Sequence, residues 1–421
     1  MLKSALVTAL LASTSVLAEG TGTQCSLDKK CPEDKPCCSQ FGECGVGAYC
    51  LGGCDPRMSF SLEACVPAPV CQDKKMDFKN IKKTVAPNNI YLGDPSKADW
   101  VSSGEPAQYG DYGLLTMGEN SFGTVLSSTR YMWYGNVKAR MKTSRGRGVV
   151  TAFILFSDVK DEIDYEWVGV DLKTTQTNYY FQGIPDYHHS GNLTMTDSYE
   201  NFHDYEIRWT PDQIMWLIDG DEKNARVFKK SDTWNKTTNS WDFPQTPSRI
   251  QLSLWPAGSP KNPPGTVNWA GGYIDWNSPA KEGPYYFATI DSVEVECWKA
   301  KSGQPGSNSG KSYSYNSLAA YNNTVVDSDK DTVLGSLYAT GLDMKKGKTD
   351  TSDSANTIPG GGSPGQDHSG DAPKSGNSGT NGDPDSCPPG TWTQQCGKST
   401  GSKTSASALA IIIAASALFW L

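Results

Sequence analysis

Three carboxylates alternate along one short segment of this sequence, Asp161-Glu-Ile-Asp-Tyr-Glu-Trp167. Alternate side chains of a β-strand share a face, so Glu162, Asp164 and Glu166 would project together. Like charges on one face repel one another, so the three carboxylates would not stabilise the fold and need another explanation. An exposed acidic edge strand or a calcium site is the alternative. An exposed edge, however, would not normally continue into the apolar run Trp167-Val-Gly-Val170.

A carboxylate cluster of this kind suits the cleavage of a glycosidic bond. That reaction needs one protonated carboxyl for the leaving oxygen and one carboxylate for the oxocarbenium-like carbon. A carboxyl between them can orient the carboxylate and keep the two outer pKa values apart. The Cα atoms of Glu162 and Glu166 would lie about 13 Å apart on an ideal strand, whereas retention needs carboxyl groups roughly 5–5.5 Å apart. The side chains must lean together, so spacing alone leaves the stereochemistry open.

These carboxylates need a sheet to hold them, and residues 72–300 predict one. The region holds 11 of the 13 tryptophans and many short β-branched and aromatic segments between Gly, Pro, Asn and Asp turns. No long segment has helical periodicity, so we predict an all-β jelly-roll sandwich. The expected strands include Gly135–Thr143, Gly148–Ser157, Asp164–Val170, Asn178–Phe181, His203–Trp209, Gln213–Ile218, Arg249–Trp255 and Phe287–Trp298.

The segment Arg249-Ile-Gln-Leu-Ser-Leu-Trp255 predicts one wall of a sugar-binding cleft. Its leucines and isoleucine would face the core, which leaves Arg249, Gln251, Ser253 and Trp255 on the other face. Sugar C–H groups stack on indole while their hydroxyls form hydrogen bonds. An ordinary amphipathic surface strand is the alternative. Further candidates for the cleft are Thr266, Trp269 and Tyr273 in the following loop, and Tyr179, Tyr180 and Gln182 opposite.

Twelve cysteines and two terminal apolar runs predict an exported chain. Nine cysteines lie between Cys25 and Cys71, a clustering that indicates disulfides rather than catalytic thiols or zinc. An odd number needs one partner from elsewhere, and Cys297 is the candidate. Sequons at Asn192, Asn235 and Asn322 agree with export.

Residues 1–18 have the pattern of a signal peptide cleaved after Ala18. The tail Ala408–Leu421, behind a polar spacer, predicts a GPI-attachment signal over residues 398–421. Attachment is expected at Gly397, with Ser399 or Gly401 as alternatives. Both apolar runs are short for a membrane-spanning helix, which is the competing interpretation of each.

The remaining regions are a cysteine-dense knot at residues 19–71 and a Ser/Gly-rich stretch at 301–397, which we predict to be a flexible stalk. A net charge of −8 and a pI near 5.2 argue against nucleic acid or anionic membranes as partners. The sequence has neither a Gly-rich nucleotide loop nor an HExxH motif. We therefore expect no cofactor and no metal, and a monomer held at the membrane only by a lipid.

The motif Glu162-Ile-Asp-Tyr-Glu166 resembles the Glu-x-Asp-x-Glu signature of glycoside hydrolase family 16. With Arg208-Trp-Thr-Pro-Asp212, Trp216-x-Ile-Asp-Gly220 and Leu252-Ser-Leu-Trp-Pro256, the region looks like the fungal Crh branch, GPI-anchored cell-wall enzymes that join chitin to β-glucan. The resemblance implies a jelly roll and a retaining mechanism with Glu162 as nucleophile, Asp164 as helper and Glu166 as acid/base. An endo-hydrolase of chitin or β-glucan, and a non-catalytic wall lectin, are the alternatives.

The knot carries a second resemblance. Cys37-Cys-Ser-Gln-Phe-Gly-Glu-Cys44, followed by Ala48-Tyr-Cys50, is similar to the hevein-like chitin-binding module. The resemblance implies three disulfides and three chitin contacts: Cys25–Cys38, Cys31–Cys44, Cys37–Cys50, and Ser39, Phe41 and Tyr49. Glu43 stands where the family has another aromatic, and Cys54, Cys65 and Cys71 depart from its pattern. The alternative is a knot that only stabilises or spaces the enzyme.

Overall fold

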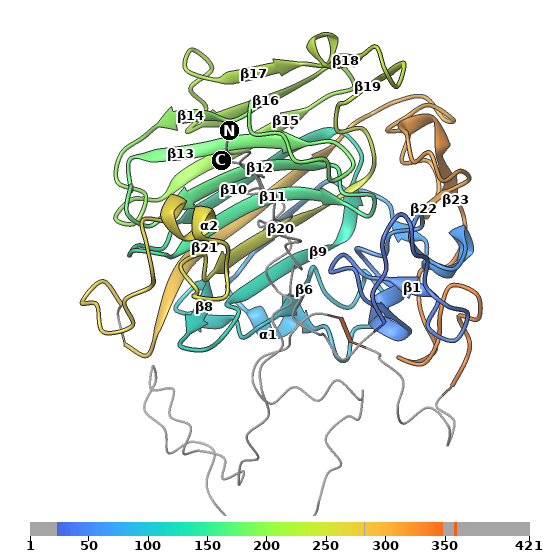
Figure 1. Cartoon of the computed structure of the whole chain (residues 1–421), viewed down its shortest axis with the longest axis horizontal. Helices are drawn as coiled ribbons and strands as arrows, with labels where there is room; N and C mark the ends of the chain where they lie inside the picture. Colours follow the sequence, from blue (N-terminus) through green and yellow to red (C-terminus); the bar gives the residue numbers. More distant parts are fainter. Residues whose placement is uncertain (1–22, 282, 348–357, 360–421) are drawn as a thin grey trace, which may run out of the picture.

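Two β-sheets packed face to face form the body of the protein (Figure 1). The structure, a computed structural model, describes residues 23–281, 283–347 and 358–359. The expected signal peptide, the expected GPI site at Gly397, and Cys387 and Cys396 lie outside these residues. The all-β prediction is confirmed, because the two α-helices of the described part, α1 (Ile81–Thr84) and α2 (Pro264–Trp269), have only four and six residues.

Each sheet has eight strands. The first has the order β17 (Arg226–Lys229), β16 (Gln213–Ile218), β15 (His203–Trp209), β10 (Gly135–Lys142), β21 (Tyr285–Cys297), β8 (Tyr112–Gly118) and β7 (Ala107–Tyr109), with β4 (Lys74–Asp77) also paired to β21. The second has the order β14 (Gly191–Thr194), β13 (Thr174–Tyr180), β12 (Glu162–Val168), β11 (Val150–Ser157), β20 (Ser248–Trp255), β9 (Thr124–Met132), β6 (Trp100–Ser103) and β5 (Val85–Pro87).

Alternating side chains from both sheets fill the space between them. In β15, Tyr205, Ile207 and Trp209 are fully buried, whereas the residues between them are partly exposed. Ile250, Leu252 and Leu254 of β20 enter the same core, as the alternation in the sequence predicts. The opposite face of β20 therefore lies on the outer surface of the second sheet, together with the carboxylates of β12.

The amino-terminal knot is built on disulfides, and the pairing Cys25–Cys38, Cys31–Cys44 and Cys37–Cys50 is confirmed. The cysteines that the sequence leaves open pair as Cys54–Cys65 and Cys71–Cys297. The last of these closes a separation of 226 residues and joins the end of the knot to the end of β21.

Residues 301–347 are folded, so the prediction of a flexible stalk from residue 301 is wrong for this part. Strands β22 (Ser312–Tyr315) and β23 (Val325–Ser328) form a small sheet with β3 (Ala68–Pro69) of the knot. Leu334 packs into a cluster with Tyr49 and the knot cysteines. Figure 1 shows this segment in orange beside the blue knot. Backbone pairing and a few well-placed apolar side chains hold a segment whose polar composition suggests disorder.

Candidate active site

Strand β12 carries the three carboxylates on the outer face of the second sheet. Ile163, Tyr165 and Trp167 point into the core, so the predicted alternation is confirmed. Glu162 and Asp164 are nonetheless buried, and Glu166 is the most open of the three. The strand begins at Glu162, two residues earlier than the sequence predicts.

Core side chains hold β12 against the opposite sheet. The Tyr165 ring stacks on Trp167 with ring centroids 5.7 Å apart, and its hydroxyl donates to the Leu217 carbonyl oxygen at 2.7 Å. The Trp216 indole N–H donates to the Asp164 carbonyl oxygen at 3.0 Å. These bonds fix the backbone of β12 at its central carboxylate.

Asp161, directly before the carboxylates, fixes the entry to the strand. Its side chain is buried and accepts hydrogen bonds from the Gln182 and Gln245 backbone N–H groups at 3.0 and 2.9 Å, and from the Thr246 hydroxyl at 2.6 Å. The sequence analysis assigns no role to this aspartate, although its position directly before the Glu162–Glu166 motif could have indicated one. It belongs to the scaffold rather than to the reacting face.

Neighbouring strands complete the face around the carboxylates. On β13, Tyr180, Asn178 and Gln176 lie directly across from Glu162, Asp164 and Glu166. On β11 the corresponding positions are apolar, namely Phe156, Ile154 and Ala152. Asn178 and Gln176 are absent from the candidates that the sequence suggests, because strand pairing alone brings them beside the site. The apolar side lowers the local polarity and the polar side supplies hydrogen-bonding groups.

Burial raises the pKa of all three carboxyl groups. The pKa of Asp164 is raised well above its usual value by burial, and the charges of Glu162 and Glu166 and a hydrogen bond to Glu162 reinforce this rise. For Glu162 burial also raises the pKa, and the hydrogen bond with Asp164 opposes that rise. Burial raises the pKa of Glu166 to about 7.

This pattern distributes the protons in a useful way. Asp164 keeps its proton and donates it in a hydrogen bond to Glu162, which favours the carboxylate form of Glu162. Burial raises the pKa of Glu162 to about 8 and that of Glu166 to about 7, so both glutamates exchange protons near neutral pH. Glu166 is protonated below its pKa and can then act as a general acid, and the hydrogen bond from Asp164 is the feature that favours the carboxylate form of Glu162.

An indole pair forms a wall beside Glu166. Trp255 and Trp269 stack with ring centroids 6.1 Å apart, and the Trp269 indole N–H donates to the Gln176 side-chain oxygen at 2.8 Å. Thr266 lies buried in the same short helix α2, and its hydroxyl has no hydrogen-bond partner among the described residues. Tyr273, in the loop that follows, is 59% exposed.

Arg249 and Gln251 lie beneath the knot rather than in an open cleft. The Arg249 Nε donates to the Ser128 carbonyl oxygen at 2.9 Å, and the Gln251 amide N–H donates to the Gln40 side chain at 3.1 Å.

The three cleft candidates on β13 and at its end lie in different places. Tyr180 lies on the carboxylate face, whereas Tyr179 enters the core and Gln182 accepts a hydrogen bond from Arg57 of the knot.

The residues expected to contact chitin in the knot are also buried. Ser39 is 2%, Phe41 7% and Tyr49 3% exposed. Tyr49 belongs to the apolar cluster with Leu334, and Ser39 and Phe41 face the second sheet. The docked knot therefore does not present them as an open surface for crystalline chitin.

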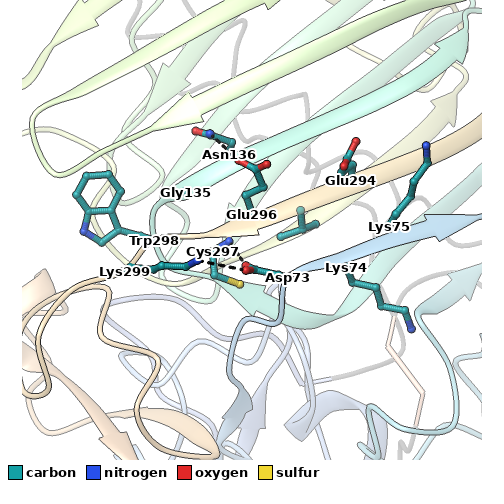
Figure 2. A pocket seen from close by; sticks show the side chains of 11 residues that line it. Asp73, Lys74, Lys75, Gly135, Asn136, Glu294, Glu296, Cys297, Trp298 and Lys299 are labelled. Atoms are coloured by element: carbon teal, nitrogen blue, oxygen red, sulfur yellow. Dashed lines mark hydrogen bonds and ion pairs between the residues drawn. The ribbon is translucent and has the colours of Figure 1, made fainter.

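Two other parts of the described structure, a cluster of cysteines and a surface hollow, lack the features of a catalytic site. The sulfur atoms of Cys25, Cys31 and Cys38 lie close together, but each is in a disulfide and so is not a free metal ligand. Figure 2 shows a hollow beside Cys297, on the solvent-facing side of the other sheet. Its acidic side chains have partners there, as in the hydrogen bond from Asn136 to Glu296 at 3.2 Å.

The comparison with known proteins agrees with this geometry. Residues 94–271 match glycosyl hydrolases family 16. The chain is 59% identical over 348 residues to Crh-like protein 3 of Botryotinia fuckeliana, covering 82% of this chain and 76% of that protein. It is 48% identical over 384 residues to Crh-like protein 2 of Aspergillus fumigatus, covering 87% and 86%.

Among solved structures, the chain is similar to the Crh5 transglycosylase in complex with NAG. The TM-score is 0.52 at 26% identity, covering 65% of this chain and 99% of that one. In the part of the chain that the structure describes, no helix has the length and apolar character needed to span a membrane.

Proposed function

The chain belongs to glycosyl hydrolase family 16, in its fungal Crh-like group, and from this we propose that it cleaves chitin and transfers the released chain to β-glucan in the cell wall. The observation that carries the proposal is the shared buried face of Glu162, Asp164 and Glu166, in which Asp164 forms a hydrogen bond with Glu162 and burial raises the pKa of Glu166 to about 7. A sugar-binding lectin would gain nothing from three buried acids that raise one another's pKa.

In the first step, the Glu162 carboxylate attacks the anomeric carbon of the donor sugar. The bond from that carbon to the leaving glycosidic oxygen breaks as Glu166 gives this oxygen its proton. The product is a glycosyl ester on Glu162. The hydrogen bond from Asp164 stabilises the ionised form of Glu162 and orients it for the attack.

In the second step, Glu166 is a carboxylate and takes the proton of an incoming hydroxyl. The oxygen of that hydroxyl attacks the anomeric carbon and releases Glu162. A sugar hydroxyl gives transfer and water gives hydrolysis, so transfer wins only if the acceptor is bound and positioned better than water. The stacked indoles of Trp255 and Trp269 beside Glu166 are suited to holding a sugar ring.

We also propose that the chain is exported and tethered by a GPI lipid at Gly397. Five disulfides among the described residues suit an oxidising compartment. Of the three sequons, Asn192 is exposed and open to glycosylation. The other two asparagine side chains already donate hydrogen bonds, Asn235 to Asp242 and Asn322 to Tyr134.

One assay tests the activity. The purified protein is incubated with soluble chitin oligomers and a labelled β-glucan oligomer, and the products are separated by mass. Labelled hybrids of the two sugars are expected. Shortened chitin oligomers without hybrids would make the protein a hydrolase, and unchanged sugars would make it a lectin.

A further inference from the structure

A row of side chains runs from the carboxylates of β12 to the edge of the second sheet. Glu166 lies directly across from Gln176 of β13, and Gln176 lies directly across from Asn192 of β14. Residues directly opposite each other in antiparallel strands project to the same face of a sheet. Asn192 therefore stands on the carboxylate face, two strands from Glu166, about 10 Å at the usual strand spacing.

The burial of the β14 side chains supports this orientation of Asn192. Leu193 packs against the core between the two sheets, whereas Asn192 and Thr194 are exposed. Because successive residues of a strand project to opposite faces, Asn192 and Thr194 both point away from the core. The three residues form the sequon Asn-Leu-Thr, to which N-linked glycans are attached. A glycosylation sequon thus lies on the same face as the proposed catalytic residues.

The knot covers this face on the other side of the carboxylates. Over β20, Gln40 of the knot accepts a hydrogen bond from the Gln251 side chain at 3.1 Å. Over β9 and β6, Phe41 lines one small pocket together with Val125 and Ser103. Figure 1 shows β14 and the blue knot on opposite sides of the molecule. A sugar chain bound at the carboxylates therefore meets the knot on one side, and on the other side it crosses β13 and β14.

The surface of β13 is polar and suits a sugar chain. The Gln176 side-chain oxygen accepts a hydrogen bond from the Trp269 indole N–H at 2.8 Å, which holds Gln176 in place. The Asn178 side-chain N–H donates to the Asp186 carbonyl oxygen at 3.3 Å. The buried Asn178 side-chain oxygen has no hydrogen-bond partner among the described residues, so a sugar hydroxyl can donate to it. A chain that continues past β13 reaches Asn192.

We propose that Asn192 carries an N-linked glycan that stands at the open end of the cleft and limits the length of sugar chain that binds across β13 and β14. This inference rests on the proposed function, including export. During export, the Asn192 side-chain nitrogen bonds to the anomeric carbon of an oligosaccharide, gives up a proton and displaces the lipid pyrophosphate that carried the oligosaccharide. The bulky glycan then occupies space that a long substrate chain needs, so long chains bind less tightly than they otherwise would.

The test uses full-length protein secreted from a fungal host, with the glycan at Asn192 measured by mass spectrometry of its peptides. Thr194→Ala removes the sequon and leaves Asn192 unaltered, whereas Thr194→Ser keeps the sequon. Chitin oligomers and labelled glucan oligomers are each varied in length while the other sugar is kept short. For one of the two sugars, loss of the glycan should lower the KM of the long oligomers roughly three- to tenfold. The KM of the shortest oligomer that reacts should not change, and the sugar that responds is the one whose chain crosses β14.

Thr237→Ala is the matched control, because it removes the sequon at Asn235 on a separate hairpin of β18 (Trp234–Asn235) and β19 (Ser240–Trp241). It should leave every KM unchanged, and glycosylated Thr194→Ser should behave as the unaltered protein.

Three results would overturn the inference. They are an Asn192 without glycan in the unaltered protein, equal KM values for long oligomers with and without the glycan, and an equal fall in KM at every oligomer length. If the unaltered protein makes no hybrid products, it is the proposed function that fails. Calorimetric binding of the same oligomers, with and without the glycan, then decides the inference.

Discussion

Asp164 is the carboxyl group that distinguishes the two glutamates beside it on the proposed catalytic face. Its own pKa is raised well above its usual value by burial and by its two glutamate neighbours. The proton that it keeps is shared with Glu162, and Glu166 has no such partner. Two chemically similar glutamates on one strand thus have different surroundings, which suits the different roles proposed for them.

We predict that Glu162→Gln abolishes transfer, because an amide cannot form the glycosyl ester. Glu166→Gln removes the general acid and should lower kcat by about 10²- to 10⁴-fold. Turnover of chitin oligomers with the labelled acceptor measures both. Glu119→Gln changes an exposed carboxylate and serves as the matched control. Normal turnover in either catalytic variant would contradict the assignment, provided that the Tm shows a folded protein.

The pH dependence follows from Glu166. Burial raises its pKa to about 7, and the first step needs its protonated form. Protonated Glu166 is lost above that pKa, whereas Glu162, whose pKa burial raises to about 8, must be ionised for the attack. The rate of glycosyl ester formation should therefore pass through a maximum near these two values and fall at higher pH. Initial rates between mildly acidic and alkaline pH measure this, and a rate that does not fall on the alkaline side would show that Glu166 is not the acid.

For single residues, the sequence correctly predicts the face on which the carboxylates lie, but it predicts few of the residues that surround them. Alternation is a local property, so it places Glu162, Asp164 and Glu166 on one face and Trp167 in the core. The neighbours Gln176 and Asn178 are set by the register of β13, which no short segment encodes. Arg249 lies on the predicted face, but its side chain packs against Gly52 of the knot, which is distant in sequence.

Strand β12 keeps its position through contacts with the opposite sheet. We predict that Tyr165→Phe lowers the free energy of unfolding by about 1–3 kcal/mol, because the buried hydroxyl that donates to the Leu217 carbonyl oxygen is lost. Urea unfolding measures the difference. Tyr109→Phe, at a tyrosine that is 69% exposed, should be neutral. An unchanged midpoint for Tyr165→Phe would mean that packing alone holds the strand.

The eight predicted strand segments all contain strands, two of them with the predicted bounds, His203–Trp209 and Gln213–Ile218. Clear alternation between turn residues explains this success. Strand β9 is missing from the prediction because its sequence, Thr-Val-Leu-Ser-Ser-Thr-Arg-Tyr-Met, does not alternate between apolar and polar residues. The order of strands in each sheet depends on contacts between distant segments, which composition and periodicity do not reveal.

At the scale of the whole molecule, the knot, the sandwich and residues 301–347 form one connected structure. The Cys71–Cys297 disulfide links the first two covalently. Backbone bonds from Gly47 to Ala339 and from Gly341 to Ala64, both 2.9 Å, link the knot to the last segment. The three regions can be told apart in the sequence because they differ in amino-acid composition. Composition does not show, however, whether the regions pack together.

This connection can be tested at Leu334, which is 2% exposed and packs against Tyr49 and the knot cysteines. We predict that Leu334→Ala destabilises the full-length protein by about 2–5 kcal/mol, because it opens a cavity between the knot and residues 301–347. Thermal and urea unfolding measure the loss. Leu342→Ala, in the same segment but 47% exposed, should have little effect. If residues 301–347 were instead a stalk independent of the knot, the two substitutions would behave alike and leave the stability unchanged.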